Sequence, residues 1–269
     1  PIGVFDSGYG GLTILSEFKS VLPEYDYLYL GDNARAPYGN RSYDVVYDFT
    51  LEAVKFLKSK GCRLVIVACN TSSAKALRTI QQQDLKDIDA DFRVLGVIRP
   101  TTETIGEMSE TKHVGILGTE GTVNSNSYVI ELNKFSPEIV VTQHAGPMWV
   151  PLIESNKYMS ESGKAIIKED FLALIKKNSK IDTVLLACTH YPIIASYLEE
   201  ISGSQVKVIS QGPIVADKLK DYLQRHEALK NQITRNGECI FMTTENPEVF
   251  NKSAQSFMSI KVSAEQIRL

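Results

Sequence analysis

Two cysteines stand at the ends of two similar apolar segments. The segments read Leu-Val-Ile-Val-Ala-Cys-Asn-Thr at residues 64–71 and Val-Leu-Leu-Ala-Cys-Thr-His at residues 184–190. A continuous apolar run of this length is typical of a strand buried on both faces in a parallel sheet, and ligands of such sheets bind just beyond the carboxyl ends of the strands. Cys69 and Cys188 are therefore predicted to lie at the mouth of a binding crevice. One thiol in each half suggests a chemistry that needs two like groups facing one substrate.

The residues next to the thiols favour the thiolate form. His190 follows Cys188 by two positions, and a nearby imidazolium would stabilise a thiolate. Thr71 or Ser72 is predicted to cap the helix after Cys69, which would put that thiol beside a positive helix terminus. A single cysteine of this kind is more often a buried small hydrophobe. The matching placement of two such cysteines argues against that interpretation.

A glycine-rich turn, Asp6-Ser7-Gly8-Tyr9-Gly10-Gly11, follows the first predicted strand. Glycines allow the backbone to approach a ligand closely, and the following helix would aim free N–H groups at an anion. The turn carries neither Gly-Lys-Ser/Thr nor G-x-G-x-x-G, so it gives little support to a nucleotide site. A plain strand–helix turn is the alternative. A carboxylate near Cys69 would repel a thiolate, so Asp6 is expected to orient the thiol or accept its proton.

Three further features leave alternatives open. The polar loop 31–39 is suited to contacting a substrate, but it also fits an ordinary Pro/Gly connection. Glu154 ends an apolar segment and is, by itself, more often solvated or capping than catalytic. Asp6, Cys69, Cys188 and His190 could together supply four metal ligands, although no short-range ligand pair supports this. Cys62 and Cys239 have no polar surroundings and are expected to be structural.

Composition narrows the class of protein. The 269 residues allow one large or two medium domains, and 43% hydrophobic with 23% charged residues fit a globular protein with a sizeable core. The net charge of −3 gives no basic excess, so no nucleic-acid partner is expected. The longest apolar runs fall far short of the ~20 residues of a membrane span. No secretion signal is expected, because strand-like sequence starts at Ile2; with no C-x-x-C pair either, the four cysteines are expected to be reduced.

Strand-like and helix-like patterns alternate along the chain, which predicts an α/β fold with mostly parallel sheets flanked by helices. Ser42 is predicted to cap a helix that ends before Gly61, and Asn246-Pro247 to open the last helix. The predicted strands are 2–6, 27–31, 64–69, 94–97, 114–118, 139–142, 184–188, 206–209 and 239–243.

The chain also contains a weak internal repeat. Ile2-Gly3-Val4-Phe5-Asp6 parallels Val114-Gly115-Ile116-Leu117-Gly118, at nearly the offset that separates the two cysteines. This predicts a duplicated half-fold with two similar domains related by an approximate two-fold axis. The segment after about residue 208 has no counterpart and is expected to pack on the first half. The expected domains are 1–97 plus 209–269, and 98–208.

Four motifs in this order resemble those of the aspartate/glutamate racemase family: residues 5–12, Pro37-Tyr38-Gly39, Ala68-Cys69-Asn70-Thr71 and Cys188-Thr189-His190. The resemblance runs along essentially the whole chain. Relatives that act on aspartate tend to carry an acid in place of His190, so the histidine favours the members that act on glutamate.

The resemblance implies a cofactor-independent isomerase that interconverts L- and D-glutamate in a cleft between two α/β domains, with Cys69 and Cys188 as its two bases. It implies no metal, a homodimer, and a cytoplasmic role in supplying D-glutamate for peptidoglycan. Further catalytic residues would be Asp6, His190 and Glu154. Residues around the substrate would be Asp6, Ser7, Pro37, Tyr38, Gly39, Cys69, Asn70, Thr71, Thr119, Cys188, Thr189 and His190.

The chain departs from the family pattern in two places. Ser210-Gln211-Gly212 stands where relatives often carry an acid, and Thr243-Thr244-Glu245-Asn246 where they often read Thr-Thr-Gly-Asp. Both lie outside the cysteine motifs and concern domain packing and assembly more than the reaction. Two rival functions use the same residues: a metal-dependent hydrolase, and a non-catalytic amino-acid-binding protein with its ligand between two lobes.

Overall fold

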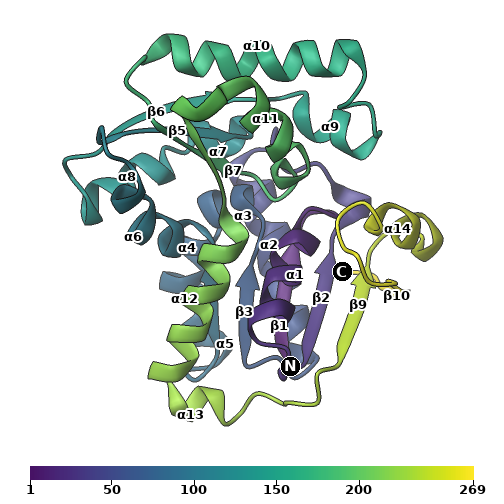
Figure 1. The fold of residues 1–269 in the computed structure, drawn as a ribbon. Helices are drawn as coiled ribbons and strands as arrows, with labels where there is room; N and C mark the ends of the chain where they lie inside the picture. Colours follow the sequence, from purple (N-terminus) through teal and green to yellow (C-terminus); the bar gives the residue numbers. More distant parts are fainter.

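Two parallel sheets with helices on their faces make up the molecule (Figure 1). The structure is a computed structural model that describes residues 1–269. The two central strands of the first sheet, β1 (Ile2–Asp6) and β2 (Tyr27–Gly31), lie side by side. Every residue in them is buried, as their continuous apolar sequences predict. The first sheet contains β1 (Ile2–Asp6), β2 (Tyr27–Gly31), β3 (Leu64–Val67), β4 (Arg93–Gly96), β9 (Cys239–Thr243) and β10 (Ala264–Gln266). The second contains β5 (His113–Gly118), β6 (Val140–Ala145), β7 (Thr183–Ala187) and β8 (Lys207–Ser210).

The order of the strands shows the duplication directly. The first sheet runs β10-β9-β2-β1-β3-β4, and the second runs β6-β5-β7-β8. If the first four strands of each half are numbered along the chain, both sheets place them in the order second, first, third, fourth. All of these pairs are parallel. The extra strands β9 and β10 extend the first sheet beside β2. Each cysteine motif follows the third strand of its half, so the two motifs occupy equivalent places.

The helix boundaries follow local sequence signals. Helix α2 begins after Ser42, whose side chain accepts a hydrogen bond from the Val45 N–H. Gly61, two residues past the end of α2, has a φ of +87°, a conformation that favours glycine. Asn246 caps α14, with Pro247 in its first turn. The other helices are α1 (Gly11–Val21), α3 (Asn70–Lys75), α4 (Leu77–Thr79), α5 (Leu85–Ile88), α6 (Ile98–Met108), α7 (Glu120–Asn124), α8 (Ser127–Phe135), α9 (Trp149–Glu154), α10 (Glu161–Lys177), α11 (Ala195–Ser202), α12 (Gln211–Arg225) and α13 (Glu227–Lys230); α2 spans Tyr43–Ser59 and α14 Pro247–Ala254.

Three strands differ clearly from the sequence-based expectation. Strand β3 ends at Val67, two residues before the predicted end at Cys69. The short strand β10 was not predicted, because three residues, of which only Ala264 is apolar, carry no periodic signal. Strand β6 ends three residues later than the predicted strand 139–142. Its side chains are mostly half-buried. The half-buried strand lies at the edge of its sheet, where the apolar signal is weak.

A helix that follows the second sheet returns to the first. Helix α12 leaves the end of β8 and runs alongside α1 and the first sheet (Figure 1). Its buried side chains join a cluster of 40 buried apolar residues that includes members of β1, β7 and α10. The two sheets therefore share one continuous core. The division into domains at residues 97 and 208 stays a prediction.

No helix of the chain combines the length and the apolar character needed to cross a membrane.

Candidate active site

Both cysteine motifs border one cavity of about 170 Å³ between the two halves. It lies at the carboxyl ends of β1, β3, β5 and β7, where a doubly wound sheet is expected to bind ligands. Its lining includes every residue proposed from the sequence except Asp6. The lining residues are Ser7, Gly8, Ala36, Pro37, Tyr38, Gly39, Asn40, Cys69, Asn70, Thr71, Thr119, Glu120, Gly146, Pro147, Val150, Pro151, Glu154, Cys188, Thr189 and His190.

Cys69 is itself the capping residue of α3. Its Sγ accepts a hydrogen bond from the Ser72 N–H at 3.5 Å, and its thiol contacts the Ser7 hydroxyl at 3.5 Å. The expectation that Thr71 or Ser72 caps this helix is wrong, because the helix already begins at Asn70, with only Ala68 and Cys69 between it and β3. The expected stabilisation of the thiolate is also outweighed: burial, with Asp6 nearby, raises the pKa of Cys69 to about 11.

Asp6 lies behind the cavity wall and is fully buried. One carboxylate oxygen accepts the Gly8 N–H at 3.1 Å and the other accepts the Thr189 hydroxyl at 3.4 Å. Burial raises the pKa of Asp6 above its ordinary value, although the charge of His190 opposes this shift. Asp6 thereby joins the glycine-rich turn of the first half to the Cys188 motif of the second.

The second thiol has a different environment. His190, 4% exposed, directs its Nε2 to the Glu154 carboxylate at 2.8 Å. Burial opposes a charge on this ring, but hydrogen bonding to Cys188 and Glu154 outweighs it and raises the pKa of His190 to about 10. Glu154 comes from the end of α9, 36 positions earlier in the chain, so only the fold brings this pair together.

The two halves contact each other through short polar side chains. The Thr71 and Thr119 hydroxyls lie 3.0 Å apart, and the Thr13 hydroxyl donates to the Thr189 carbonyl at 2.9 Å. A Cβ added to Gly10 would lie 2.3 Å from the Thr189 hydroxyl and 2.4 Å from Nδ1 of His190. The turn after β1 can therefore approach the Cys188 motif this closely only with glycine at this position.

Sequence reasoning includes Asp32 in the loop 31–39 but gives it no role of its own. Asp32 is fully buried behind the loop 36–39, and accepts hydrogen bonds from the Tyr38 hydroxyl, from Arg35 Nε at 2.6 Å and from the Thr244 hydroxyl at 2.9 Å. These bonds fix the loop that carries Pro37 and Gly39 into the cavity wall. An aspartate directly after a strand is a local signal, but its partner Thr244 is remote in the sequence.

The wall formed by Gly146, Pro147, Val150 and Pro151 was also missed. These residues follow the carboxyl end of β6, which the sequence-based prediction placed three residues too early. With the observed end at Ala145, the position of this segment at the cavity follows from the same rule that located the cysteines.

The lining of the cavity contains no Lys or Arg. Its charged side chains are Glu120, Glu154 and His190, and the remaining polar groups are hydroxyls, amides, thiols and backbone groups. Neutral donors of this kind can hold a carboxylate without a full counter-charge. The structure has no group of three or more His, Cys, Asp or Glu side chains arranged to hold a metal ion, so the four-ligand arrangement considered for Asp6, Cys69, Cys188 and His190 does not form.

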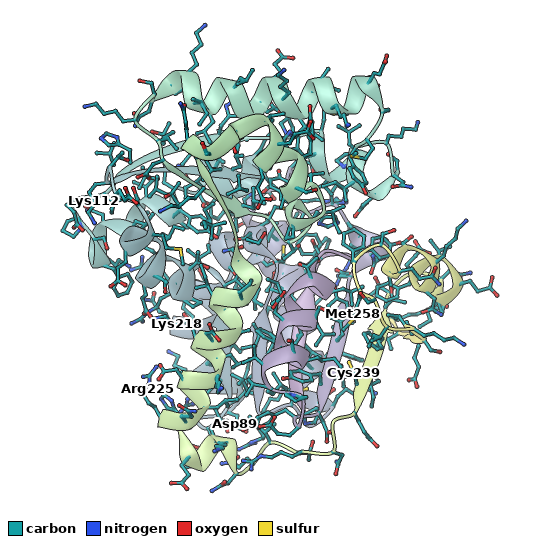
Figure 2. All side chains as sticks on the ribbon, in the orientation of Figure 1. Asp89, Lys112, Lys218, Arg225, Cys239 and Met258 are labelled. Atoms are coloured by element: carbon teal, nitrogen blue, oxygen red, sulfur yellow. The ribbon has the colours of Figure 1, made fainter.

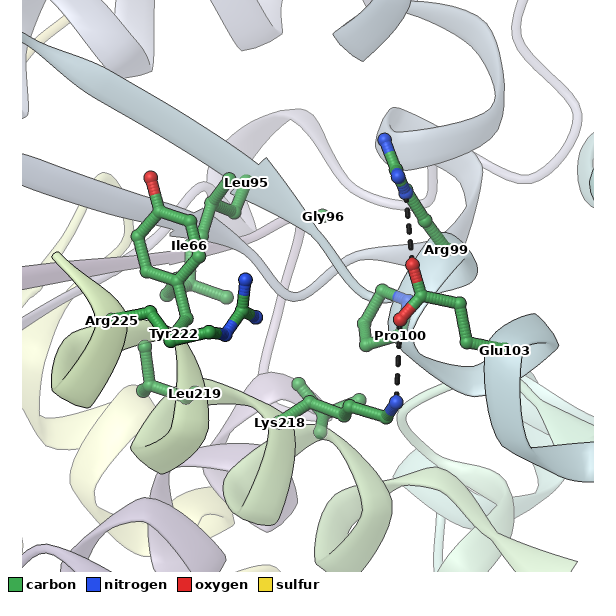
Figure 3. Close-up of a pocket in the computed structure, with 11 residues that line it drawn as sticks. Ile66, Leu95, Gly96, Arg99, Pro100, Glu103, Lys218, Leu219, Tyr222 and Arg225 are labelled. Atoms are coloured by element: carbon green, nitrogen blue, oxygen red, sulfur yellow. Dashed lines mark hydrogen bonds and ion pairs between the residues drawn. The ribbon is translucent and has the colours of Figure 1, made fainter.

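A larger cavity, of about 270 Å³, lies elsewhere, between α6, α12 and the edge of the first sheet. Figure 3 shows the Glu103 carboxylate there between Arg99, at 3.0 Å, and Lys218, at 3.3 Å. No cysteine or histidine lines it, so the smaller cavity carries the acid–base groups. The other two cysteines line neither of these cavities. Cys62 is buried in the core, and Figure 2 shows Cys239 on β9, away from the junction of the halves.

Comparison with known proteins gives a consistent assignment. A family model described as Asp/Glu/Hydantoin racemase matches residues 13–219. The glutamate racemase of Streptococcus agalactiae is 35% identical over 269 residues, covering 100% of this chain and 98% of the relative. That of Bacillus cereus is 37% identical, covering 95% of this chain and 92% of the relative.

Two crystal structures are similar along the whole chain. A glutamate racemase from Bacillus anthracis is 33% identical with a TM-score of 0.90. A glutamate racemase from Francisella tularensis, in complex with D-glutamate, is 32% identical with a TM-score of 0.87. Each comparison covers 100% of this chain and 97% of the other. By sequence and by fold, the chain belongs to the Asp/Glu/Hydantoin racemase family and groups with its glutamate racemases.

Proposed function

We propose that this racemase interconverts L- and D-glutamate by proton transfer between the α-carbon and two cysteines, without a cofactor. One observation carries the proposal: Cys69 and Cys188, at equivalent positions of two duplicated halves, line the same cavity. Glutamate as the substrate is supported by the relatives, of which the one from Francisella tularensis was solved with D-glutamate.

Inversion of an α-carbon requires a proton to leave one face and another to arrive on the opposite face. In the proposed step, a thiolate takes the α-proton, and the electron pair of the broken C–H bond delocalises into the α-carboxylate. The thiol on the other side then donates its proton to carbon, and its S–H electron pair stays on sulfur. The two cysteines exchange protonation states, so solvent must return each to its starting state between turnovers.

The surroundings of the two thiols divide the task unequally. The buried carboxyl Asp6 and the raised pKa of Cys69 favour the protonated thiol on that side. The pKa of His190, raised to about 10, leaves a positive charge beside Cys188 at neutral pH, which would stabilise a thiolate there. We infer that the two thiols differ in how they are activated, because burial and Asp6 act on Cys69 whereas the charge of His190 acts on Cys188.

Substrate binding follows from the neutral hydrogen-bond donors of the lining. Ser7, Asn70, Thr71, Thr119 and Thr189 would donate hydrogen bonds to the two carboxylates of glutamate. Hydrogen bonds that strengthen as charge moves into the α-carboxylate stabilise the carbanionic transition state more than the ground state. Close positioning is needed because the α-hydrogen is a very weak acid.

Racemisation of each enantiomer in heavy water tests the two-base mechanism. The product should carry deuterium at its α-carbon early in the reaction, while the remaining starting material stays protiated, because each base exchanges with solvent before it donates. Equal early labelling of both pools would contradict two distinct bases. Full activity after chelator treatment would exclude the metal-dependent hydrolase.

Replacement of the thiols tests their assignment. Cys69→Ala and Cys188→Ala should each abolish racemisation, measured by circular dichroism of L- or D-glutamate solutions. Cys239→Ala is the matched control, because Cys239 is a free thiol remote from the cavity. Its racemisation rate should stay within about 2-fold of the wild type, as expected for a substitution away from functional groups. Retained activity in either cavity variant would overturn the proposal.

We further propose that the product D-glutamate supplies peptidoglycan synthesis in a bacterial cytoplasm, and that the enzyme works as a homodimer. The bacterial origin of the racemases above supports the first statement. Depletion of the protein in its host should make growth and cell shape depend on added D-glutamate. Light scattering of the purified protein would test the second.

A further inference from the structure

We propose that Gln211 is a positioning residue for racemisation, which holds the Asn70 carboxamide in the cavity wall from the other side of the junction between the halves. The inference rests on the proposed function, since it names a residue that serves the same cavity. Gln211 does not line the cavity.

The side chain of Gln211 is buried and fully used. It is 2% exposed, and its Oε1 accepts the Asn70 Nδ2–H at 2.7 Å. Its Nε2 donates to the Tyr128 hydroxyl and to the Thr101 hydroxyl at 3.1 Å. The Tyr128 hydroxyl in turn donates to the Asn70 Oδ1 at 2.6 Å. Asn70, Gln211 and Tyr128 thus form a closed ring of three hydrogen bonds, which we call the Asn70–Gln211–Tyr128 ring.

The ring joins elements of both halves. Asn70 opens α3 directly after Cys69, whereas Tyr128 comes from α8 and Thr101 from α6, which pack around the second sheet. Gln211 is the first residue of α12, where the chain leaves β8 and returns to the first sheet (Figure 1). A change in how the two halves sit against each other would therefore move the Asn70 carboxamide.

The ring also determines which polar group Asn70 offers to the cavity. Its Oδ1 is engaged by Tyr128, and one Nδ2–H is engaged by Gln211. Asn70 lines the cavity, and its second Nδ2–H has no hydrogen-bond partner within the protein. The ring therefore fixes Asn70 as a donor, the polarity that a substrate carboxylate requires.

Glutamine is suited to this position because one acceptor and two donors are needed within one short side chain. A carboxylate would supply no donor to Tyr128 and Thr101. An apolar residue would leave the Asn70 Nδ2 without its acceptor and both hydroxyls without the donor that Gln211 supplies. Methionine has nearly the same length and volume as glutamine and makes none of these bonds. Gln211→Met therefore removes the ring at little steric cost.

The experiment compares Gln211→Met, Asn70→Ala and the double variant by steady-state kinetics with each enantiomer of glutamate. Rates are normalised to the folded fraction of each protein. Gln143→Met is the matched control: Gln143 is a half-buried glutamine of the second sheet that donates to Asn126 Oδ1 at 3.0 Å and does not line the cavity.

Gln211→Met should lower kcat/KM by about 10- to 100-fold, the loss expected when a substrate-positioning group is displaced. The factor must be equal in both directions, because enantiomers have the same free energy and their equilibrium constant is one. In the Asn70→Ala background, the same substitution should change kcat/KM by less than about 2-fold, since the two residues act as one unit. The control should also change kcat/KM by less than about 2-fold.

Additive losses in the double variant, or a Gln211→Met loss no greater than that of the control, would overturn the inference, because a purely structural role predicts either result. If Gln211→Met does not fold, Tyr128→Phe replaces it in the same cycle, since it removes one oxygen from the ring. Wild-type protein without glutamate racemisation would refute the proposed function itself. Wild-type turnover with an unaffected Gln211→Met would refute only the role of Gln211.

Discussion

His190 is distinguished from the other three histidines by its neighbours. Its ring is buried between the Cys188 thiol and the Glu154 carboxylate. It also packs edge-on against the Phe257 ring, with 5.2 Å between the two ring centroids. Each neighbour by itself is an ordinary residue. Together they hold a proton on an imidazole that would lose it near neutral pH in water. The charge that favours a thiolate is therefore a property of the cluster and not of the histidine alone.

The pH dependence of stability should report this charge. Because the folded pKa of His190 is raised from 6.5 to about 10, the protonated ring stabilises the folded state fully below pH 6.5. This contribution should fall as pH rises from 6.5 through about 10. The difference in urea-unfolding free energy between wild type and His190→Asn should shrink over the same range. His226→Asn, at an exposed histidine, is the control, and a difference independent of pH would contradict the assignment.

At the scale of elements, the loop 31–39 shows how a cavity wall is held in place. The loop follows β2 and has little regular structure, yet Asp32 holds it through bonds to Tyr38, Arg35 and Thr244. The same Arg35 also pairs with Glu52 of α2 at 2.6 Å on the outer side. One arginine thus has a fully buried partner and a partner whose side chain is 51% exposed.

Asp32 and Glu52, the two carboxylates that bind Arg35, give a prediction in which one residue serves as the control for the other. Asp32→Asn should destabilise the protein by about 1.5 to 3 kcal/mol, because it removes the buried charge that accepts hydrogen bonds from Arg35, Tyr38 and Thr244. It should also lower kcat/KM, because Tyr38 and the cavity wall lose their anchor. Glu52→Gln should cost less than about 1 kcal/mol, as is usual for an exposed ion pair. Chemical denaturation and glutamate kinetics of both variants check this, and equal effects would count against the anchoring role.

At the scale of the molecule, each sheet has an aspartate at the amino end of one strand. Asp26 precedes β2 and accepts hydrogen bonds from the Asn236 and Glu238 N–H groups at 2.8 and 2.9 Å. It thereby ties the segment before β9 to the first sheet. Asp182 precedes β7 and accepts the Glu110 and Thr111 N–H groups at 2.7 and 2.8 Å. The two aspartates join segments that are remote in sequence.

Acid unfolding should depend on these two residues. Burial alone would raise their pKa values, but the hydrogen bonds lower the pKa of both Asp26 and Asp182 to about 2. Their stabilisation is present above about pH 4 and should be lost as pH falls from 4 to 2. Asp26→Asn and Asp182→Asn should each flatten the fall in unfolding free energy over this range, measured by circular dichroism. An unchanged slope in both variants would contradict the prediction.

Much of the fold can be predicted from the sequence because its signals are local. Apolar runs mark nearly all strands, Ser42 and Asn246 mark helix starts, and the repeated Ala-Cys marks the equivalent strands of two halves. The rule that ligands bind at the carboxyl ends of parallel strands then directs attention to both cysteine motifs. Each of these inferences needs only a few consecutive residues.

Only the tertiary structure decided the rest. The contacts of Asp6 with Thr189, of His190 with Glu154 and of Asn70 with Gln211 join residues 183, 36 and 141 positions apart. The raised pKa of Cys69 comes from its burial, whereas the local sequence indicates a helix terminus that would favour the thiolate. Such contacts depend on how the two sheets pack across their junction. No pattern of consecutive residues encodes that packing, because it is set by the summed fit of side chains over the whole core.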